Sequence, residues 1–100
     1  MTEEIDTGSE AYEVGLSHGW DHANFVDAYG KEHDRRTPAV PSCYQEITYG
    51  SAMYWSLTAA ERGAEDNKRR TQHREFTAGW SEGKKRFRYG KYPDGTKIPD

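Results

Sequence analysis

The chain has few aliphatic side chains for its length of 100 residues. Leu, Ile, Val and Phe together number eleven, a share that is typical of chains that fail to fold. Thirteen aromatic residues and a net charge of only −3 argue against disorder, because rings bury apolar area and a weak net charge does not hold a chain open. We therefore predict one small domain, residues 1–100, with a thin aromatic core that a second copy could complete in a homodimer.

Long apolar runs and cysteine pairs are also missing. No segment approaches the roughly 18 consecutive apolar residues of a membrane span, and the first six residues are acidic where an export signal is basic and then apolar. Cys43 is the only cysteine, which excludes an internal disulfide and indicates a reducing compartment. We expect a soluble, cytoplasmic protein that makes no membrane contact.

Motifs of catalysis and cofactor binding are absent as well. The sequence has no glycine-rich phosphate loop, no Gly-x-Ser-x-Gly elbow and no paired cysteines of a zinc site. His18 and His22 stand four residues apart, as metal ligands on a helix do, but the sequence supplies no evident third ligand. A solvent-facing histidine pair is the more frequent case. We predict no enzyme activity, no cofactor and no metal, with His18 and His22 as weak metal candidates only.

Helix-capping signals mark the first helix and the loop after it. Thr7 and Glu10 have the spacing of a capping box, and Gly30 suits the end of a helix, which predicts a helix over 9–29. Two prolines and a cluster of charges then predict a connecting loop over 30–41.

The rest of the chain reads as further helix and a tail. Ser42 with Gln45 repeats the capping signature and predicts a helix over 42–63. Amphipathic spacing resumes only near the C-terminus. The polar stretch 61–75 is either helix or loop. A helix is predicted over 76–89, and an extended tail is predicted over 90–100. No segment alternates as a strand does, so we predict an all-α fold, a small bundle of about three helices with an extended C-terminal tail.

Two stretches repeat an aromatic residue followed by glycine three and seven positions later. Glycine inside a helix costs about 1 kcal/mol relative to alanine, so four of them need an offsetting gain. On a helix these positions share one face, where small residues let two backbones approach closely. A slot for a planar ligand is the alternative, but packing is the more frequent reason. We predict that the first and last helices pack through Tyr12, Gly15, Leu16, Gly19, Phe76, Gly79 and Gly83.

Charge is segregated along the chain. Residues 1–60 hold three basic and ten acidic side chains, and residues 61–100 hold eleven basic and seven acidic ones. Basic side chains interleaved with rings could contact an acidic partner protein, or could bind phosphates and stack on unpaired bases. The alternative is that the basic helix only neutralises the acidic first helix. The predicted partner-binding residues are Arg74, Trp80, Lys84, Lys85, Arg86, Phe87, Arg88, Tyr89 and Lys91.

Scattered motifs resemble ribosome modulation factor, a family of short helical proteins that bind the ribosome. The shared order is a Tyr-x-x-Gly-x-x-x-Gly stretch, a Cys-Tyr pair and a Gly-Trp pair, here Tyr12 to Gly19, Cys43 with Tyr44, and Gly79 with Trp80. The chain departs from the family in its greater length, its acidic first half and its proline, which precedes the cysteine. The resemblance implies an RNA-binding alternative.

These observations favour a protein that acts by binding. The leading hypothesis is a small, non-enzymatic helical protein that binds a larger protein and inhibits or modulates it, as compact phage accessory proteins do, an analogy that rests on size and on the missing catalytic motifs. The alternative is an RNA-binding or DNA-binding modulator that uses the same basic, aromatic C-terminal helix.

Overall fold

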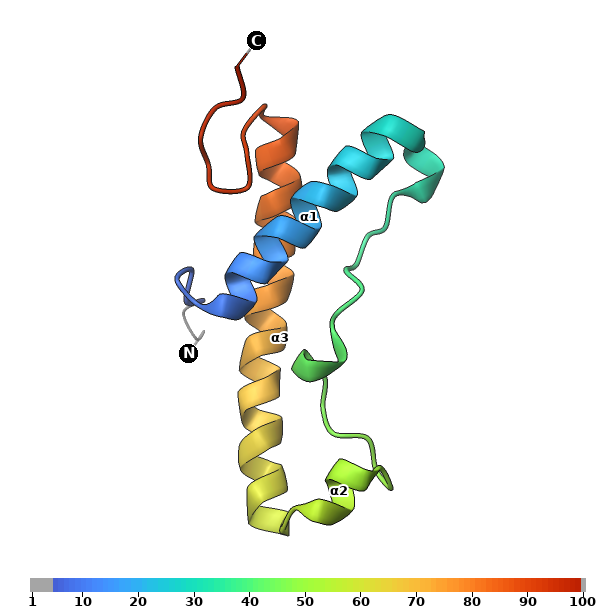
Figure 1. The fold of residues 1–100 in the computed structure, drawn as a ribbon, viewed down its shortest axis with the longest axis vertical. Coiled ribbons are helices and arrows are strands. Elements are labelled where there is room, and N and C mark those ends of the chain that lie inside the picture. The colour runs from blue at the N-terminus through green and yellow to red at the C-terminus, as the bar shows by residue number, and fades with distance from the viewer. Residues whose placement is uncertain (1–4, 100) are drawn as a thin grey trace.

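The computed structural model describes residues 5–99 and confirms an all-α fold (Figure 1). Its helices are α1 (Glu10–Tyr29), two short 3₁₀ helices η1 (Lys31–His33) and η2 (Ser42–Tyr44), α2 (Ala52–Ser56) and α3 (Ala59–Arg88). Within residues 5–99 there is no strand, only an isolated bridge between Lys91 and Lys97. No helix in this part of the chain has the length and apolar character needed to cross a membrane.

Local signals set the two ends of α1. The Ser9 side chain accepts a hydrogen bond from the Tyr12 amide at 3.1 Å, so Ser9 is the N-cap in place of the predicted Thr7. At the other end Gly30 has a φ of 119°, and its amide donates to the Val26 carbonyl. The helix therefore occupies almost the range that the capping signals predicted.

The core lies where α1 crosses α3, with both helices running in the same direction (Figure 1). A Cβ atom added to Gly15 or Gly19 would overlap the backbone of Phe76 or Trp80. The relation is reciprocal, because a Cβ atom at Gly79 or Gly83 would overlap the backbone of α1. The two glycine stripes thus face each other, and backbone contact replaces the ligand slot that was the alternative.

Aromatic rings fill most of the small core around this crossing. Phe76 is fully buried, and the other buried apolar side chains are Ala11, Tyr12, Leu16, Tyr44 and Trp80. Tyr44 comes from η2 and lies 5.8 Å from the ring of Phe76, so the connecting segment contributes to the core as well as the helices. The structure therefore places all seven residues of the predicted helix contact at the α1–α3 crossing.

The helix predicted over 42–63 does not form. Only η2 and the five-residue α2 are helical between the loop and α3, because Gly50 takes a φ of 83° and Leu57 is extended. Ser42 does begin a turn, but the next backbone hydrogen bond is of the 3₁₀ type and the turn stops at Tyr44.

The polar stretch 61–75 and the helix 76–89 are one continuous helix, α3. Thr58 and Glu61 form a complete capping box at its start, a signal as strong as those at Thr7 and Ser42. The Glu65–Arg69 pair, at 3.0 Å, supports the next turn. The polar residues therefore continue the helix that is buried farther along, because adding residues to an existing helix costs less free energy than starting a new one.

The C-terminal tail is folded and is not extended as predicted. Gly90 and Gly95 take positive φ angles of 71° and 92°, and the Tyr92 amide donates to the Thr96 carbonyl at 2.7 Å. The indole N–H of Trp20 donates to the Lys91 carbonyl at 2.6 Å. A tight turn, residues 91–98, is thereby held against α1.

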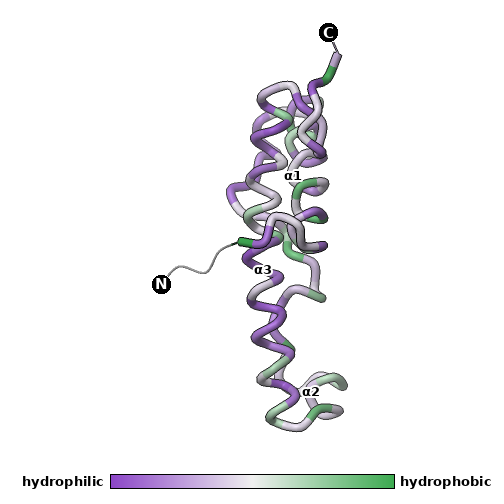
Figure 2. Tube along the Cα trace, turned by 90° about the vertical axis from the view of Figure 1, so that its left-hand side faces the viewer, coloured by the Kyte–Doolittle hydropathy of each residue, from purple (hydrophilic) through white to green (hydrophobic). Residues whose placement is uncertain are grey.

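Parallel helices need a long connection, and this connection shapes the molecule. From the end of α1 the chain returns along α3 to its distant N-terminal end, where α2 lies (Figures 1 and 2). The first half of α3 therefore extends beyond α1, and the molecule measures 54 × 29 × 22 Å. Its radius of gyration is 16.1 Å, against about 13 Å for a compact chain of this length.

Candidate functional site

Four of the nine predicted partner-binding side chains are committed to the fold. Trp80 is only 5% exposed, and its ring stacks on His22 at 5.5 Å between centroids. Phe87 packs edge-on against Trp20 at 5.3 Å. The other two, Lys84 and Arg86, make internal polar contacts. None of the four is available as an open contact, which corrects the prediction for these side chains.

Lys84 connects α3 to the loop after α1. Its Nζ lies 3.0 Å from the Asp34 carboxylate and 3.2 Å from the Arg35 carbonyl, and it also lies 4.5 Å above the Trp80 ring. The hydrogen bond from Lys84 holds the pKa of Asp34 below its ordinary value. Lys84 is therefore a structural cation, although it lies beside the exposed Lys85 in the sequence.

Arg86 has a similar structural role on the other side of α3. Its Nη1 donates to the Pro93 carbonyl at 2.6 Å, and its Nε lies 3.3 Å from Glu82 Oε1. The guanidinium thus secures the C-terminal turn to the helix. Charge-assisted hydrogen bonds of this kind are stronger than neutral ones, so releasing Arg86 to a partner would cost part of the fold.

Four of the five remaining predicted residues form the basic face, which we define as Lys85, Arg88, Tyr89 and Lys91. All four side chains are exposed, and the Tyr89 ring keeps 65% of its area accessible. Helical spacing places residues 85, 88 and 89 on the side of α3 away from α1. Within residues 5–99, none of the three cations makes an ion pair or a side-chain hydrogen bond. This surface can accept negative charge from outside.

Arg74 lies on the same side of α3, three turns before Lys85, and is exposed. Its side chain has an interaction of its own and also lines a groove described below. We therefore leave Arg74 out of the basic face.

The acidic residues of α1 lie on the opposite side of the helix pair. Glu10, Glu13 and Asp21 are exposed and occupy the face of α1 that points away from α3. Among the described residues no ion pair joins α1 to α3; the longer-range pairs run from α3 to the connecting segment, as Lys84–Asp34 and Arg70–Glu46 do. The alternative in which the basic helix neutralises the acidic one has no direct ion pair to support it among these residues, because the glycine stripes occupy the contact.

The histidine pair has contacts other than a metal. His18 lies edge-on to Phe76 at 5.3 Å, and His22 Nε2 accepts the Arg35 amide at 3.1 Å. His22 Nε2 also lies 3.4 Å from the Asp34 carboxylate. Across residues 5–99, no group of three or more His, Cys, Asp or Glu side chains is arranged to hold a metal ion. His22 instead helps to fix the loop over the core.

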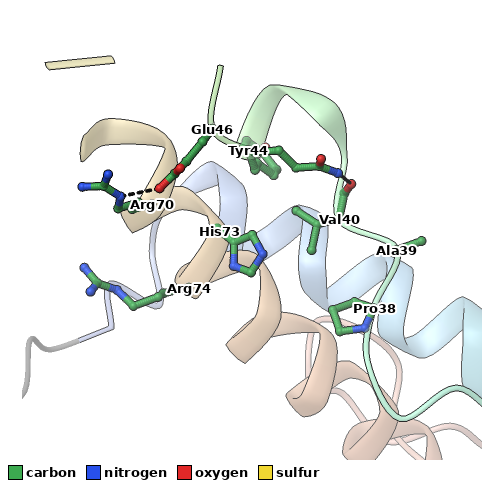
Figure 3. Close-up of a pocket in the computed structure, with 9 residues that line it drawn as sticks. Pro38, Ala39, Val40, Tyr44, Glu46, Arg70, His73 and Arg74 are labelled. Atoms are coloured by element: carbon green, nitrogen blue, oxygen red, sulfur yellow. Dashed lines mark hydrogen bonds and ion pairs between the residues drawn. The ribbon is translucent and has the colours of Figure 1, made fainter. Parts of the chain in front are cut away.

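Two surface features lie outside the predicted site. The first is a groove of about 850 Å³ between the connecting segment and α3 (Figure 3). Its apolar wall comes from Pro38, Ala39, Val40 and Tyr44, and its polar wall comes from Glu46 with the α3 side chains Arg70, His73 and Arg74. No pattern in the sequence marks it, because residues 34–41, which supply most of its apolar wall, have no regular structure.

The second feature is the aromatic tip, which we define as Tyr49, Met53, Tyr54 and Trp55. It consists of three residues of α2 and Tyr49 just before it, at the end of the molecule farthest from the basic face (Figure 1). Tyr49 and Trp55 keep 76% and 67% of their areas exposed. The sequence does carry a signal for the tip: residues 47–60 contain no charged side chain, in a chain with 31% charged residues. The prediction of one helix over 42–63 concealed this signal.

Comparison of the chain with protein-family models, with curated proteins and with solved structures gave no match. The function must therefore be argued from the chemistry of these surfaces.

Proposed function

We propose that this protein is a non-enzymatic interaction protein that binds an acidic surface of a larger protein through its basic face and thereby inhibits or modulates that partner. The observation that carries the proposal is the division of the cations of α3. Lys84 and Arg86 are held by internal contacts, whereas Lys85 and Arg88, close in sequence to the exposed Tyr89, make no ion pair to a described residue, and neither does Lys91 just beyond the helix.

The chemistry of this face suits a protein interface. Tyrosine and arginine are enriched among the residues that dominate binding energy, because they combine a large contact area with directional hydrogen bonds. Three cations within two turns of one another also attract an acidic surface during the encounter. The acidic face of α1 points away from this surface, so it does not oppose an acidic partner at contact distance.

Binding of RNA or DNA through the same face is the second candidate. Tyr89 lies exposed beside Arg88 and Lys91, an arrangement in which an unpaired base could stack while the cations contact phosphates. We rank it second because the chain carries a net charge of −3, and a dedicated nucleic-acid-binding domain is usually basic overall.

We place this binding in the cytoplasm. Cys43 is a free and exposed thiol, and such a thiol persists in a reducing compartment and is prone to oxidation elsewhere.

The test compares two variants that change the net charge equally. Lys85→Glu/Arg88→Glu alters the basic face, and Lys68→Glu/Arg36→Glu alters exposed cations elsewhere. Wild type and both variants are immobilised, proteins of the native host are captured and quantified, and the stoichiometry of any retained partner is measured by calorimetry.

We expect a stoichiometric partner that is lost with the first variant and kept with the second. Equal retention by both variants would contradict the role of the basic face. A mobility shift of single-stranded RNA or DNA that weakens steeply with salt, with no retained protein, would establish the second candidate instead.

A further inference from the structure

The aromatic tip is held in place by contacts within the chain. Arg62 lies 4.2 Å above the Tyr54 ring, and its Nη1 donates to the carbonyls of Tyr54 and Leu57 at 2.9 and 2.6 Å. The Ser51 hydroxyl caps α2 by accepting from the Tyr54 amide. The rings are therefore ordered before any partner arrives, which lowers the entropy cost of binding.

The three rings also contact one another. Tyr54 lies 4.8 Å from Tyr49 and 5.0 Å from Trp55 between centroids, in edge-to-face geometry. Residues 47–60 are uncharged, so the tip presents a protruding apolar surface with no like-charge repulsion toward a second copy. Figure 2 shows this apolar segment at the end of a largely hydrophilic α3. Exposed aromatic surface of this kind marks an interaction site.

The exposed area of the aromatic tip limits how two copies of the chain could form a stable interface. Tyr49 and Trp55 together leave roughly 300 Å² accessible in each copy, taking about 150–250 Å² for a whole aromatic side chain. Direct contact between two tips would bury about 600 Å² in total, roughly half of what a specific, stable interface requires. A tip that enters a concave surface buries a similar area on both sides, so two such contacts reach about 1,200 Å².

The groove between the connecting segment and α3 is a concave surface of the required chemistry. Its apolar wall, Pro38 to Val40 with Tyr44, suits an aromatic ring, and Arg70 on the other wall can stack on a ring as Arg62 does on Tyr54 (Figure 3). The groove begins about 17 Å along α3 from the first residue of that helix, where the tip lies. Two antiparallel copies can therefore overlap along this length.

We propose that the protein forms a two-fold symmetric dimer in which the aromatic tip of each copy binds in the groove of the other. The contact is isologous, because the tip of one copy meets the groove of its partner and the reverse holds equally. The basic faces stay exposed at the far ends of the dimer, so the proposal does not depend on the function proposed for them.

The experiment measures mass against concentration by analytical ultracentrifugation of the full chain. Wild type should show a monomer–dimer equilibrium. Trp55→Ser removes the most prominent ring, and Ala39→Glu places a charge in the groove at an exposed position. Each should raise the dimer dissociation constant about a hundredfold, because every dimer loses two equal contacts. Tyr29→Ser, which alters an exposed ring far from both features, should leave it unchanged.

Two results would overturn the proposal. A wild type that stays monomeric at every concentration excludes the dimer, and a dimer that survives Ala39→Glu excludes the groove. Helical circular dichroism should match wild type for all variants, since the altered side chains are exposed. The melting temperature should match at concentrations at which wild type is monomeric, because the dimer itself adds stability at higher concentrations.

The thiol of Cys43 allows an independent measurement of the distance between the two copies. Cys43 is exposed and is the only cysteine, so a spin label there reports the separation between two copies. The proposed dimer predicts a label separation of about 20–30 Å, whereas contact between the two tips predicts about 33 Å or more, twice the distance along α3 from the tip to Arg69, which contacts residue 42. A separation in the longer range would overturn the tip-in-groove arrangement.

Discussion

The Lys84 ammonium lies 3.0 Å from the Asp34 carboxylate and joins the loop after α1 to the C-terminal end of α3. This contact explains why Lys84 is only 18% exposed, although the lysine that follows it faces solvent. Three groups, the Asp34 carboxylate, the Arg35 carbonyl and the Trp80 ring, share one cation. Adjacent lysines in one basic run therefore serve different purposes.

Lys84→Met should raise the pKa of Asp34 toward its ordinary value. In the folded wild type this pKa is lowered chiefly by Lys84, so the pair stabilises the protein above the unfolded-state pKa of Asp34 and loses that effect as pH falls through the folded pKa. The share of the stability difference that comes from the Lys84–Asp34 pair should thus be present at neutral pH and vanish in acid. It should stay below about 1 kcal/mol, because the carboxylate is half exposed.

The measurement for this prediction is the ¹³C shift of the Asp34 carboxyl carbon against pH, together with urea unfolding at neutral and acidic pH. Lys68→Met, which removes an exposed lysine elsewhere on α3, is the control and should leave the Asp34 titration unchanged. An Asp34 pKa that does not move in Lys84→Met would refute the assignment.

Gly19→Ala should destabilise the fold by about 1–3 kcal/mol, because a methyl group there overlaps the Trp80 backbone and forces α1 and α3 apart. Gly63→Ala is the matched control, since Gly63 also lies inside a helix but a Cβ there meets nothing within 4 Å. The control should gain up to about 1 kcal/mol from its higher helix propensity. Urea unfolding of both variants measures the contrast, and shifts of the same sign would contradict it.

Trp20→Phe should release the C-terminal turn while leaving the helix pair intact. The variant keeps a ring against Phe87 but loses the indole donor to the Lys91 carbonyl, a bond whose net contribution is about 1 kcal/mol. We expect faster hydrogen exchange at the amides of Tyr92 and Ile98 and unchanged exchange within α1. Trp55→Phe should show no such change, and an equal effect of both variants would show that the indole bond does not hold the turn.

Arg62→Met should loosen α2 without unfolding α3. The substitution removes two hydrogen bonds to the carbonyls of Tyr54 and Leu57 and the cation above the Tyr54 ring, while a similar apolar stem remains. Hydrogen exchange in residues 52–57 should quicken, and exchange near Phe76 should not. Protection in α2 that equals wild type would mean that Ser51 alone suffices to hold the helix.

Local signals predicted the elements whose ends are set by neighbouring residues. Gly30 closes α1, and the repeated glycine spacing indicated a face for close helix contact. The capping signature at Ser42 was misleading, because only the residues that follow decide whether a turn continues as a helix. The equally clear signature at Thr58 starts the longest helix of the molecule.

The candidate site could be predicted only in outline. Basic and aromatic composition pointed to the C-terminal end of α3, but it could not separate Lys85 from Lys84 or Arg88 from Arg86. That division depends on two contacts. Asp34 reaches Lys84 from a loop that is distant in the sequence, and Pro93 reaches Arg86 from the C-terminal turn, which was not predicted to fold back on α3. The aromatic tip escaped prediction because its rings come together only when the helix over 42–63 is interrupted.

The sequence by itself determined an all-α chain with two glycine-bearing helix faces, a thin aromatic core and a basic C-terminal end, since each of these follows from local spacing and composition. The tertiary structure decided the parallel direction of α1 and α3, the cations that remain exposed, and the distant position of the aromatic tip. The reason is that backbone contact at Gly15, Gly19, Gly79 and Gly83 sets how the helices cross, and all charged side chains must then find partners or solvent around that crossing.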